Sequence, residues 1–168
     1  MIKMILCTGR NYELGYNNQL LGHYPEDLKY FKETTQGCTV VMGNNTFKSL
    51  PFKDGLPNRK NIVLTSEKQP CYIGLRRGSG VKKVNDVDKL IEDLLAFQED
   101  VFIIGGANVY EQFKDVVQEI HWSMIDKDFP NANVHFDIGF VRNALQWEKV
   151  KFKELSKDVS LRVYKKIV

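Results

Sequence analysis

Uninterrupted apolar runs and amphipathic stretches alternate along the first part of the chain. Residues 2–8 are apolar on both faces apart from Lys3, and residues 101–104 are apolar throughout. Such runs are typical of strands in the middle of a sheet that is covered on both faces. Residues 38–42 and 61–65 give two further buried strands, and residues 71–84 hold two short strands around an exposed turn.

Helices are predicted between these strands. Pro25 marks the first turn of a helix that runs to about Thr35, after a loop over residues 9–24 with Asn17-Asn18 as a turn signal. A short helix covers about residues 45–50, and another starts near Asn108. Apolar residues recur at helical spacing from Val87 to Leu95, with Asn85 or Asp86 as the cap.

The last third of the chain alternates with a period of two. Residues 119–126 place Ile120 and Trp122 on one face of a strand, and His121 and Ser123 on the other. Residues 147–154 and 160–167 form a plausible antiparallel pair. Strands separated by helices, followed by a terminal hairpin, predict an α/β domain with a mostly parallel sheet and an antiparallel edge.

Bulk composition excludes several classes of protein. The 168 residues fit one domain, and the net charge of +3 is too mild to predict nucleic-acid binding. Residues 1–7 are too short for a signal peptide or membrane span. Cys7, Cys38 and Cys71 indicate reduced thiols in a cytosolic protein. The three histidines lack the spacing of metal ligands, so no metal is expected.

Asp27 is the most informative residue. In the predicted helix it shares a face with Leu28 and Phe31, whereas Glu26 and Lys29 supply the solvated face. A carboxylate on an apolar face is costly unless it has a partner. The alternative is that Asp27 only complements the helix dipole from the first turn.

Two junctions place glycine where a buried strand ends and a helix begins. One is Gly43 with residues 44–46, and the other is Gly105-Gly106 with residues 107–110. Free amides at a helix start can bind phosphate, so the pair could hold a dinucleotide across the carboxyl ends of the strands. The alternative is that these glycines only allow tight turns. Arg59 is either suited to bind a carboxylate or is an ordinary surface arginine.

In combination these stretches resemble the dihydrofolate reductase family. The match continues in order and spacing to about Asp126, and Asp128, His135 and Phe136 fit a family-like loop more loosely. The matching stretches are residues 14–18, 25–28 with 31–32, 41–43 with 46–51, 56–61 and 103–110. The resemblance implies one family-like domain over residues 1–168, with a sheet of about eight strands, a C-terminal antiparallel hairpin and about four helices.

The resemblance also implies an activity, the NADPH-dependent reduction of 7,8-dihydrofolate to tetrahydrofolate for one-carbon metabolism. Asp27 would accept hydrogen bonds from pterin N3 and the 2-amino group, and Ser123 would support it through its hydroxyl. Water would protonate N5, and burial would raise the Asp27 pKa. A cytoplasmic monomer that also binds antifolates, with no nucleic-acid or membrane partner, is expected.

The family implies further site residues. The substrate would contact Ile5, Leu28, Phe31, Leu50, Ile104 and Arg59, the last through the glutamate α-carboxylate. The cofactor would contact Cys7, Leu14, Gly15, Asn18, Asn44, Asn45, Thr46, Thr65, Ser66, Gly105, Gly106, Ala107, Asn108, Val109 and Tyr110. A cis peptide is expected between Gly105 and Gly106.

Three positions depart from the family pattern. Gly22 replaces the usual tryptophan of the loop over the active site, and Asn44 and Asn108 lack basic side chains for the NADPH 2′-phosphate. Compensation could come from Arg76, Arg77, Lys82 or Lys83. The departures leave open a noncatalytic or altered-specificity nucleotide- or pterin-binding relative. A reductase of another heterocycle, such as the one in riboflavin synthesis, is disfavoured because Asp27 and Arg59 occur together.

Overall fold

One nine-stranded sheet contains strands from both ends of the chain. The computed structural model describes residues 1–16, 19–68, 72–76 and 79–167. Successive pairs from β9 to β7 in the sheet are parallel, whereas β11–β12, β12–β9 and β7–β6 are antiparallel. The order is β11 (Trp147–Glu154), β12 (Val159–Lys166), β9 (Glu119–Ile125), β1 (Ile2–Thr8), β8 (Val101–Gly105), β4 (Thr39–Gly43), β5 (Lys60–Leu64), β7 (Ser79–Val84) and β6 (Tyr72–Arg76).

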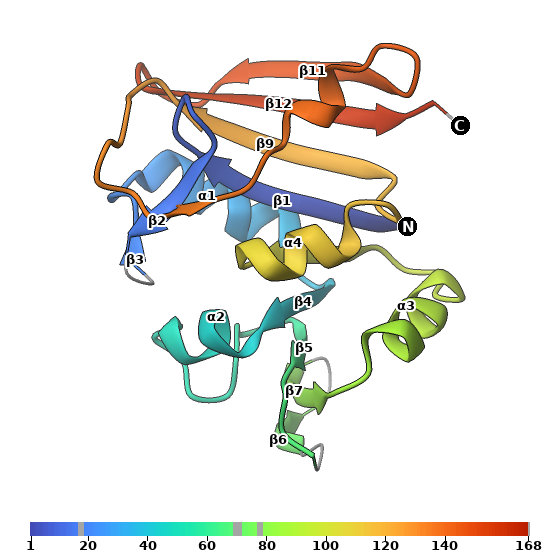
Figure 1. Ribbon diagram of the computed structural model, residues 1–168. Coiled ribbons are helices and arrows are strands. Elements are labelled where there is room, and N and C mark those ends of the chain that lie inside the picture. The colour runs from blue at the N-terminus through green and yellow to red at the C-terminus, as the bar shows by residue number, and fades with distance from the viewer. Residues whose placement is uncertain (17–18, 69–71, 77–78, 168) are drawn as a thin grey trace.

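Helices cover both faces of this sheet (Figure 1). The helices α1 (Pro25–Thr35) and α2 (Asn44–Ser49) pack on one face, where Phe31 and Phe47 join the cluster around Val40 and Phe102. The helices α3 (Val87–Leu95) and α4 (Ala107–Phe113) pack on the other face, around Trp122. Figure 1 shows α1 behind β1 and α4 in front of it. None of the helices among the described residues is long and apolar enough to span a membrane.

The side-chain alternation in β9 follows the predicted phase. Ile120 and Trp122 are fully buried on the α4 face, where the Trp122 indole N–H donates to Thr8 Oγ1 at 2.9 Å. His121 and Ser123 therefore face α1. β9 pairs with β1 along one edge and with β12 along the other, so it is an interior strand of the sheet.

The mostly parallel sheet, its antiparallel C-terminal strands and the four helices are confirmed. The expectation of a loop throughout residues 9–24 is wrong. This segment contains β2 (Glu13–Tyr16) and β3 (Gln19–Leu20), which form a small sheet with β10 (Val134–His135) in the order β10-β2-β3. These strands are too short to carry a periodic apolar pattern, so the sequence gives little local sign of them. The predicted Asn17-Asn18 turn lies outside the described residues.

Candidate active site

Asp27 lies in the first turn of α1 and faces the ends of two central strands. Cys7 of β1 and Ser123 of β9 are direct partners in the parallel ladder, and both side chains donate hydrogen bonds to the Asp27 carboxyl. Burial raises the pKa of Asp27, and the bonds from Ser123 and Cys7 oppose that rise without cancelling it. Burial beside Asp27 also raises the pKa of the Cys7 thiol, which stays protonated and able to donate.

Asp27 has no cationic partner within the described part of the chain. A role limited to the helix dipole does not account for its two side-chain donors from the sheet. A carboxylate has about four acceptor positions, so two hydrogen bonds leave capacity for a ligand that presents a pair of N–H donors. The arrangement therefore suits recognition of a planar heterocycle with adjacent amino and ring N–H groups.

The predicted substrate residues lie together on the α1 face of the sheet. Ile5 is buried there, and Phe31, Leu50 and Ile104 are partly buried against the same cluster. Leu28, also predicted to contact the substrate, is 44% exposed. The side-chain hydrogen bonds to Asp27 come from the strands beneath it.

Arg59 is not an ordinary surface arginine, since only 3% of it is exposed. Its Nε donates to the Pro57 carbonyl at 2.9 Å and its Nη1 to Thr35 Oγ1 at 3.0 Å. The guanidinium lies 6.0 Å from the centre of the Phe31 ring. Burial lowers its pKa, and no acidic partner neutralises it among the residues described. Nη2 therefore remains suited to bind an incoming carboxylate.

Asn61 holds the loop that carries Arg59. Its Oδ1 accepts from the Leu56 amide at 2.9 Å, and its Nδ2 donates to the carbonyls of Leu56, Arg59 and Gly80 at 3.0–3.1 Å. The side chain is 2% exposed, so each of these bonds is made in the interior. A buried amide with satisfied donors and acceptor fixes the loop backbone, and with it the start of the Arg59 side chain.

The two predicted phosphate-binding junctions meet at one edge of the sheet. Gly43 pairs with Leu64, and Met42 pairs with Gly105, so β4, β5 and β8 end side by side. A Cβ at Gly43 would lie 3.1 Å from Val109 Cγ2, and one at Gly106 would lie 3.6 Å from Thr46 Oγ1. The absence of a side chain at Gly43 therefore lets Val109 of α4 pack closely against the end of β4.

The expected cis peptide between Gly105 and Gly106 is confirmed. Tyr110 is buried, its hydroxyl donates to the Ile5 carbonyl at 2.9 Å, and its N–H donates to the Gly106 carbonyl at 3.0 Å. Tyr110 thus joins this edge to β1 and has no free amide for a phosphate. The backbone of residues 107–109 is left for that contact, because the first amides of a helix lack intrahelical partners.

Comparison with known proteins agrees with this geometry. A family model described as dihydrofolate reductase matches residues 1–166. The chain belongs to the dihydrofolate reductase family. It is 33% identical to the dihydrofolate reductase of Bacillus subtilis over 158 residues, which are 94% of this chain and 86% of that protein.

Other members of the dihydrofolate reductase family are also similar. The Staphylococcus aureus MSSA476 enzyme is 37% identical over 116 residues, or 69% of this chain and 65% of that protein. A solved structure, dihydrofolate reductase from Enterococcus faecalis complexed with NADP(H) and RAB-propyl, superposes with a TM-score of 0.81. The two sequences are 25% identical, and the superposition covers 100% of this chain and 97% of the Enterococcus faecalis chain.

The remaining predicted cofactor residues surround the same edge. Thr65 is buried at the end of β5, where its Oγ1 accepts from the Glu67 amide at 3.1 Å, and Ser66 is exposed next to it. Leu14 and Gly15 lie in β2, whereas Asn18 is outside the described residues. Asn44 Oδ1 is buried without a hydrogen-bond partner in the described part of the chain, so it can accept a donor from a bound nucleotide.

The basic residues near this edge differ in position. Lys83 lies 5.6 Å from the Phe47 ring of α2 and 3.7 Å from the Glu67 carboxylate, on the face where α2 packs. Lys82 is exposed and pairs in register with Ile62, which belongs to the cluster on the opposite face. Arg77 and the side chain of Arg76 fall outside the described residues.

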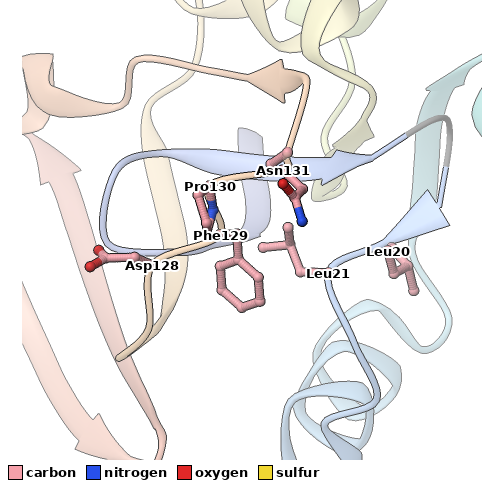
Figure 2. Close-up of a pocket in the computed structure, with 7 residues that line it drawn as sticks. Leu20, Leu21, Asp128, Phe129, Pro130 and Asn131 are labelled. Atoms are coloured by element: carbon pink, nitrogen blue, oxygen red, sulfur yellow. The ribbon is translucent and has the colours of Figure 1, made fainter.

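A surface hollow of about 510 Å³ separates the end of β3 from the β9–β10 loop (Figure 2). Figure 2 shows Leu21 beside Phe129 and Asn131, with Leu20 farther along the β3 side. Asp128 and Pro130 also line it, but none of the predicted substrate residues does. The hollow is therefore a feature of the loops beside the site and not the place of Asp27.

Glu13, which sequence reasoning did not single out, joins these loops. Its carboxylate accepts from the Asn11 amide at 2.7 Å and the Phe129 amide at 2.6 Å, and only 2% of the residue is exposed. Burial raises the pKa of Glu13, but the backbone N–H donors outweigh it and the net pKa is lowered. Asn11 also donates to Asp128 Oδ1 at 3.1 Å, so side chains join the start of β2 and the turn before it to the β9–β10 loop.

A polar network beneath Asp27 was also missed. Tyr30 of α1 hydrogen-bonds His121, which contacts Glu119, and Glu119 pairs with Lys3. The sequence held one signal for it, because Lys3 interrupts an apolar strand and Glu119, His121 and Ser123 alternate on one face. Only the β1–β9 register brings Lys3 opposite Glu119.

Proposed function

We propose that this protein is an NADPH-dependent dihydrofolate reductase that converts 7,8-dihydrofolate to tetrahydrofolate for one-carbon metabolism. The observation that carries the proposal is the half-buried Asp27, held by Cys7 and Ser123 and lacking a cationic partner among the described residues. Membership of the family supports the reaction class. Asp27 and Arg59 together favour a substrate that has both an amino-substituted ring and a carboxylate tail.

Asp27 has the central role in this proposal. Its carboxyl accepts hydrogen bonds from pterin N3 and the 2-amino group, and these contacts polarise the ring for protonation of N5 by water. The raised pKa of Asp27 brings its protonation equilibrium closer to neutral pH than that of an ordinary aspartate. Ser123 and Cys7 hold the carboxyl in orientation, so that it need not reorganise when charge develops on the ring.

The rest of the substrate follows the α1 face. Ile5 and Ile104 lie beneath the pterin, Leu28 and Phe31 pack beside it, and Leu50 contacts the aminobenzoyl ring. Arg59 binds the glutamate α-carboxylate through the N–H groups that its protein partners leave free. These contacts act on parts of the substrate that do not react, so they serve binding and alignment.

The residues at the carboxyl edge of the sheet fit the dinucleotide cofactor. NADPH, when bound there, would supply the hydride for reduction of the pterin. Cys7, Leu14, Gly15, Gly105 and Gly106 would lie along the nicotinamide half. Asn44 to Thr46 and Ala107 to Val109 would bind the pyrophosphate, and Thr65 and Ser66 the adenosine ribose.

We further propose that the protein is a cytoplasmic monomer that also binds antifolates and has no nucleic-acid partner. The thiols of Cys7 and Cys38 are free, which suits a reducing compartment, and the net charge of +3 is small. Light scattering coupled to size-exclusion chromatography tests the oligomeric state. A dimer mass at micromolar concentration would contradict the monomer.

Loss of NADPH absorbance in the presence of 7,8-dihydrofolate tests the activity. The reaction should require both compounds and the folded protein, and should yield tetrahydrofolate in equal amount to NADP⁺. A heterocycle that lacks the glutamate tail is the matched comparison, and it should react with a much higher KM. Absence of turnover by well-folded protein that still binds NADPH would contradict the proposed function.

A further inference from the structure

Helix α1 is attached to β9 at two successive points. Ser123 donates a hydrogen bond to Asp27. One helical turn later, the Tyr30 hydroxyl lies 2.5 Å from Nδ1 of His121. Residues three apart share a helix face, and residues two apart share a strand face. The two bonds therefore fix both the rotation of α1 about its axis and its position along β9.

The hydrogen-bond directions in the second attachment follow from Glu119. The His121 Nε2 lies 2.9 Å from Glu119 Oε2, and the bond from His121 is the main reason that the pKa of Glu119 is lowered to about 2. An ionised carboxylate only accepts, so Nε2 carries the hydrogen. In the neutral imidazole Nδ1 then accepts, and the Tyr30 hydroxyl donates to it.

The His121 ring is held on both sides. Its centroid lies 5.7 Å from that of Phe102 in an edge contact and 6.0 Å from that of Tyr30. Glu119 in turn accepts from Lys3 Nζ at 2.8 Å, and Lys3 also contacts Asp100 at 3.1 Å. The anchor for Tyr30 thus belongs to the rigid centre of the sheet, because Lys3 is on β1 and Glu119 is on β9.

We infer that the Tyr30–His121 hydrogen bond is a positioning device for Asp27, which holds the first turn of α1 so that the carboxyl faces the pterin edge. The inference rests on the proposed function. Neither Tyr30 nor His121 touches the reacting atoms, and both act through Asp27. Among the residues that the structure describes, the Asp27 contacts with Cys7 and Ser123 are the other side-chain hydrogen bonds between the N-terminal half of α1 and the central strands.

Tyr30→Phe removes the donor and keeps the ring, and Tyr164→Phe is the matched control. Tyr164 is a buried tyrosine whose side chain belongs to the cluster on the opposite face of the sheet. Tyr30→Phe should lower kcat/KM for dihydrofolate about fivefold, the loss expected for one intramolecular hydrogen bond. The Kd for NADPH should not change, and Tyr164→Phe should alter neither quantity.

Crossing Tyr30→Phe with Asp27→Asn separates positioning from a general structural effect. If Tyr30 acts through Asp27, its substitution should cause no further loss of kcat/KM in the Asp27→Asn background. An equal loss in both backgrounds, or no loss beside a native Asp27, would overturn the inference. An Asp27→Asn variant as active as the native protein would instead contradict the proposed role of Asp27.

A readout that needs no turnover keeps the two proposals separate. Among the described residues, Cys7, Ser123, Tyr30 and Tyr110 interact with Asp27, so its carboxyl titration reports on how α1 is seated. Tyr30→Phe should shift the carbon-13 titration of the Asp27 carboxyl, whereas Tyr164→Phe should not. An unshifted titration would overturn the positioning role even if the protein does not turn over dihydrofolate.

His121→Asn is the conservative variant of the partner residue. Its amide oxygen lies about where Nδ1 does, so it can still accept from Tyr30, whereas His121→Phe cannot. Activity with His121→Asn should therefore be closer to the native value than with His121→Phe. Equal losses in the two variants would contradict the importance of the Tyr30 bond.

Discussion

Cys7 and Ser123 occupy the same rung of the β1–β9 ladder, and both donate to the carboxyl of Asp27. Because their bonds favour the ionised carboxyl, Ser123→Ala should raise the Asp27 pKa above its already raised native value. Cys7→Ala should act in the same direction. Carbon-13 titration of the Asp27 carboxyl measures both effects.

Ser160→Ala serves as the control for Ser123→Ala. It removes a hydroxyl from β12, where Ser160 accepts from Arg162 at 2.8 Å and does not contact Asp27. The Asp27 titration should be unaffected by this change. A lowered Asp27 pKa in Ser123→Ala would mean that Ser123 stabilises the neutral form.

Asp27→Asn should cut turnover at neutral pH by about a hundredfold or more, which is the range of contributions from positioned acid–base groups. The amide cannot supply two acceptor oxygens to the pterin amino edge. Activity should recover partly in acid, where the substrate is more easily protonated in solution. Steady-state assays across pH, with NADPH binding as the check on folding, measure this result, and unchanged turnover would remove Asp27 from the mechanism.

Arg59→Ala should raise KM for dihydrofolate about tenfold to a hundredfold with little change in kcat, because a charge-assisted contact of ~1.5–3 kcal/mol on a nonreacting group is lost. Arg59→Lys keeps the charge but not the planar pair of donors, so its KM should lie between that of the native protein and that of Arg59→Ala. Initial-rate measurements with each variant separate KM from kcat. A native KM in Arg59→Ala would place the glutamate tail elsewhere.

Lys83 should provide preference for NADPH over NADH in place of the basic residue missing at Asn44. It lies on the α2 face, whereas Lys82 pairs with a residue of the opposite face. Lys83→Gln should lower the ratio of kcat/KM for the two cofactors about tenfold, the scale of one charge-assisted phosphate contact. Lys82→Gln is the control and should leave the ratio unchanged. Parity between the cofactors in the native protein would mean that no basic group contacts the 2′-phosphate.

Glu13→Gln should lower the free energy of unfolding at neutral pH by ~1–2 kcal/mol, because a buried carboxylate that accepts backbone N–H groups becomes a weaker, neutral acceptor. In the folded protein the pKa of Glu13 is below its ordinary value of 4.5. The ionised Glu13 therefore stabilises the fold fully above pH 4.5, and this contribution is lost as the pH falls through the folded-state pKa. Denaturant unfolding at several pH values should show the difference shrinking in acid. The exposed Glu26→Gln should show little difference, and a pH-independent loss in Glu13→Gln would contradict this account.

Local patterns sufficed to predict the elements around Asp27. The strand from Ile2 to Thr8 and the helix from Pro25 to Thr35 were expected at the bounds observed, because an apolar run and a first-turn proline mark them. The phase of β9 was likewise correct, since alternation fixed which face Ser123 occupies. The site residues were then predicted from the resemblance of these stretches, in their order along the chain, to the family.

Contacts that depend on strand register could not be predicted. Nothing in the local sequence places Lys3 opposite Glu119 or aligns Tyr30 with His121, because sheet order and helix rotation decide both. The burial of Arg59 likewise depends on Asn61, which reaches back to the loop through side-chain bonds. The 44% exposure of Leu28 could not be predicted either, since helical spacing gives a shared face but not what covers it.

A crystal structure of the ternary complex with NADPH and folate would show whether Asp27 binds the pterin. Both Asp27 oxygens should lie within hydrogen-bond distance of pterin N3 and the 2-amino group, with the nicotinamide ring against the pterin. A pterin whose amino edge points to solvent, away from α1, would contradict this expectation.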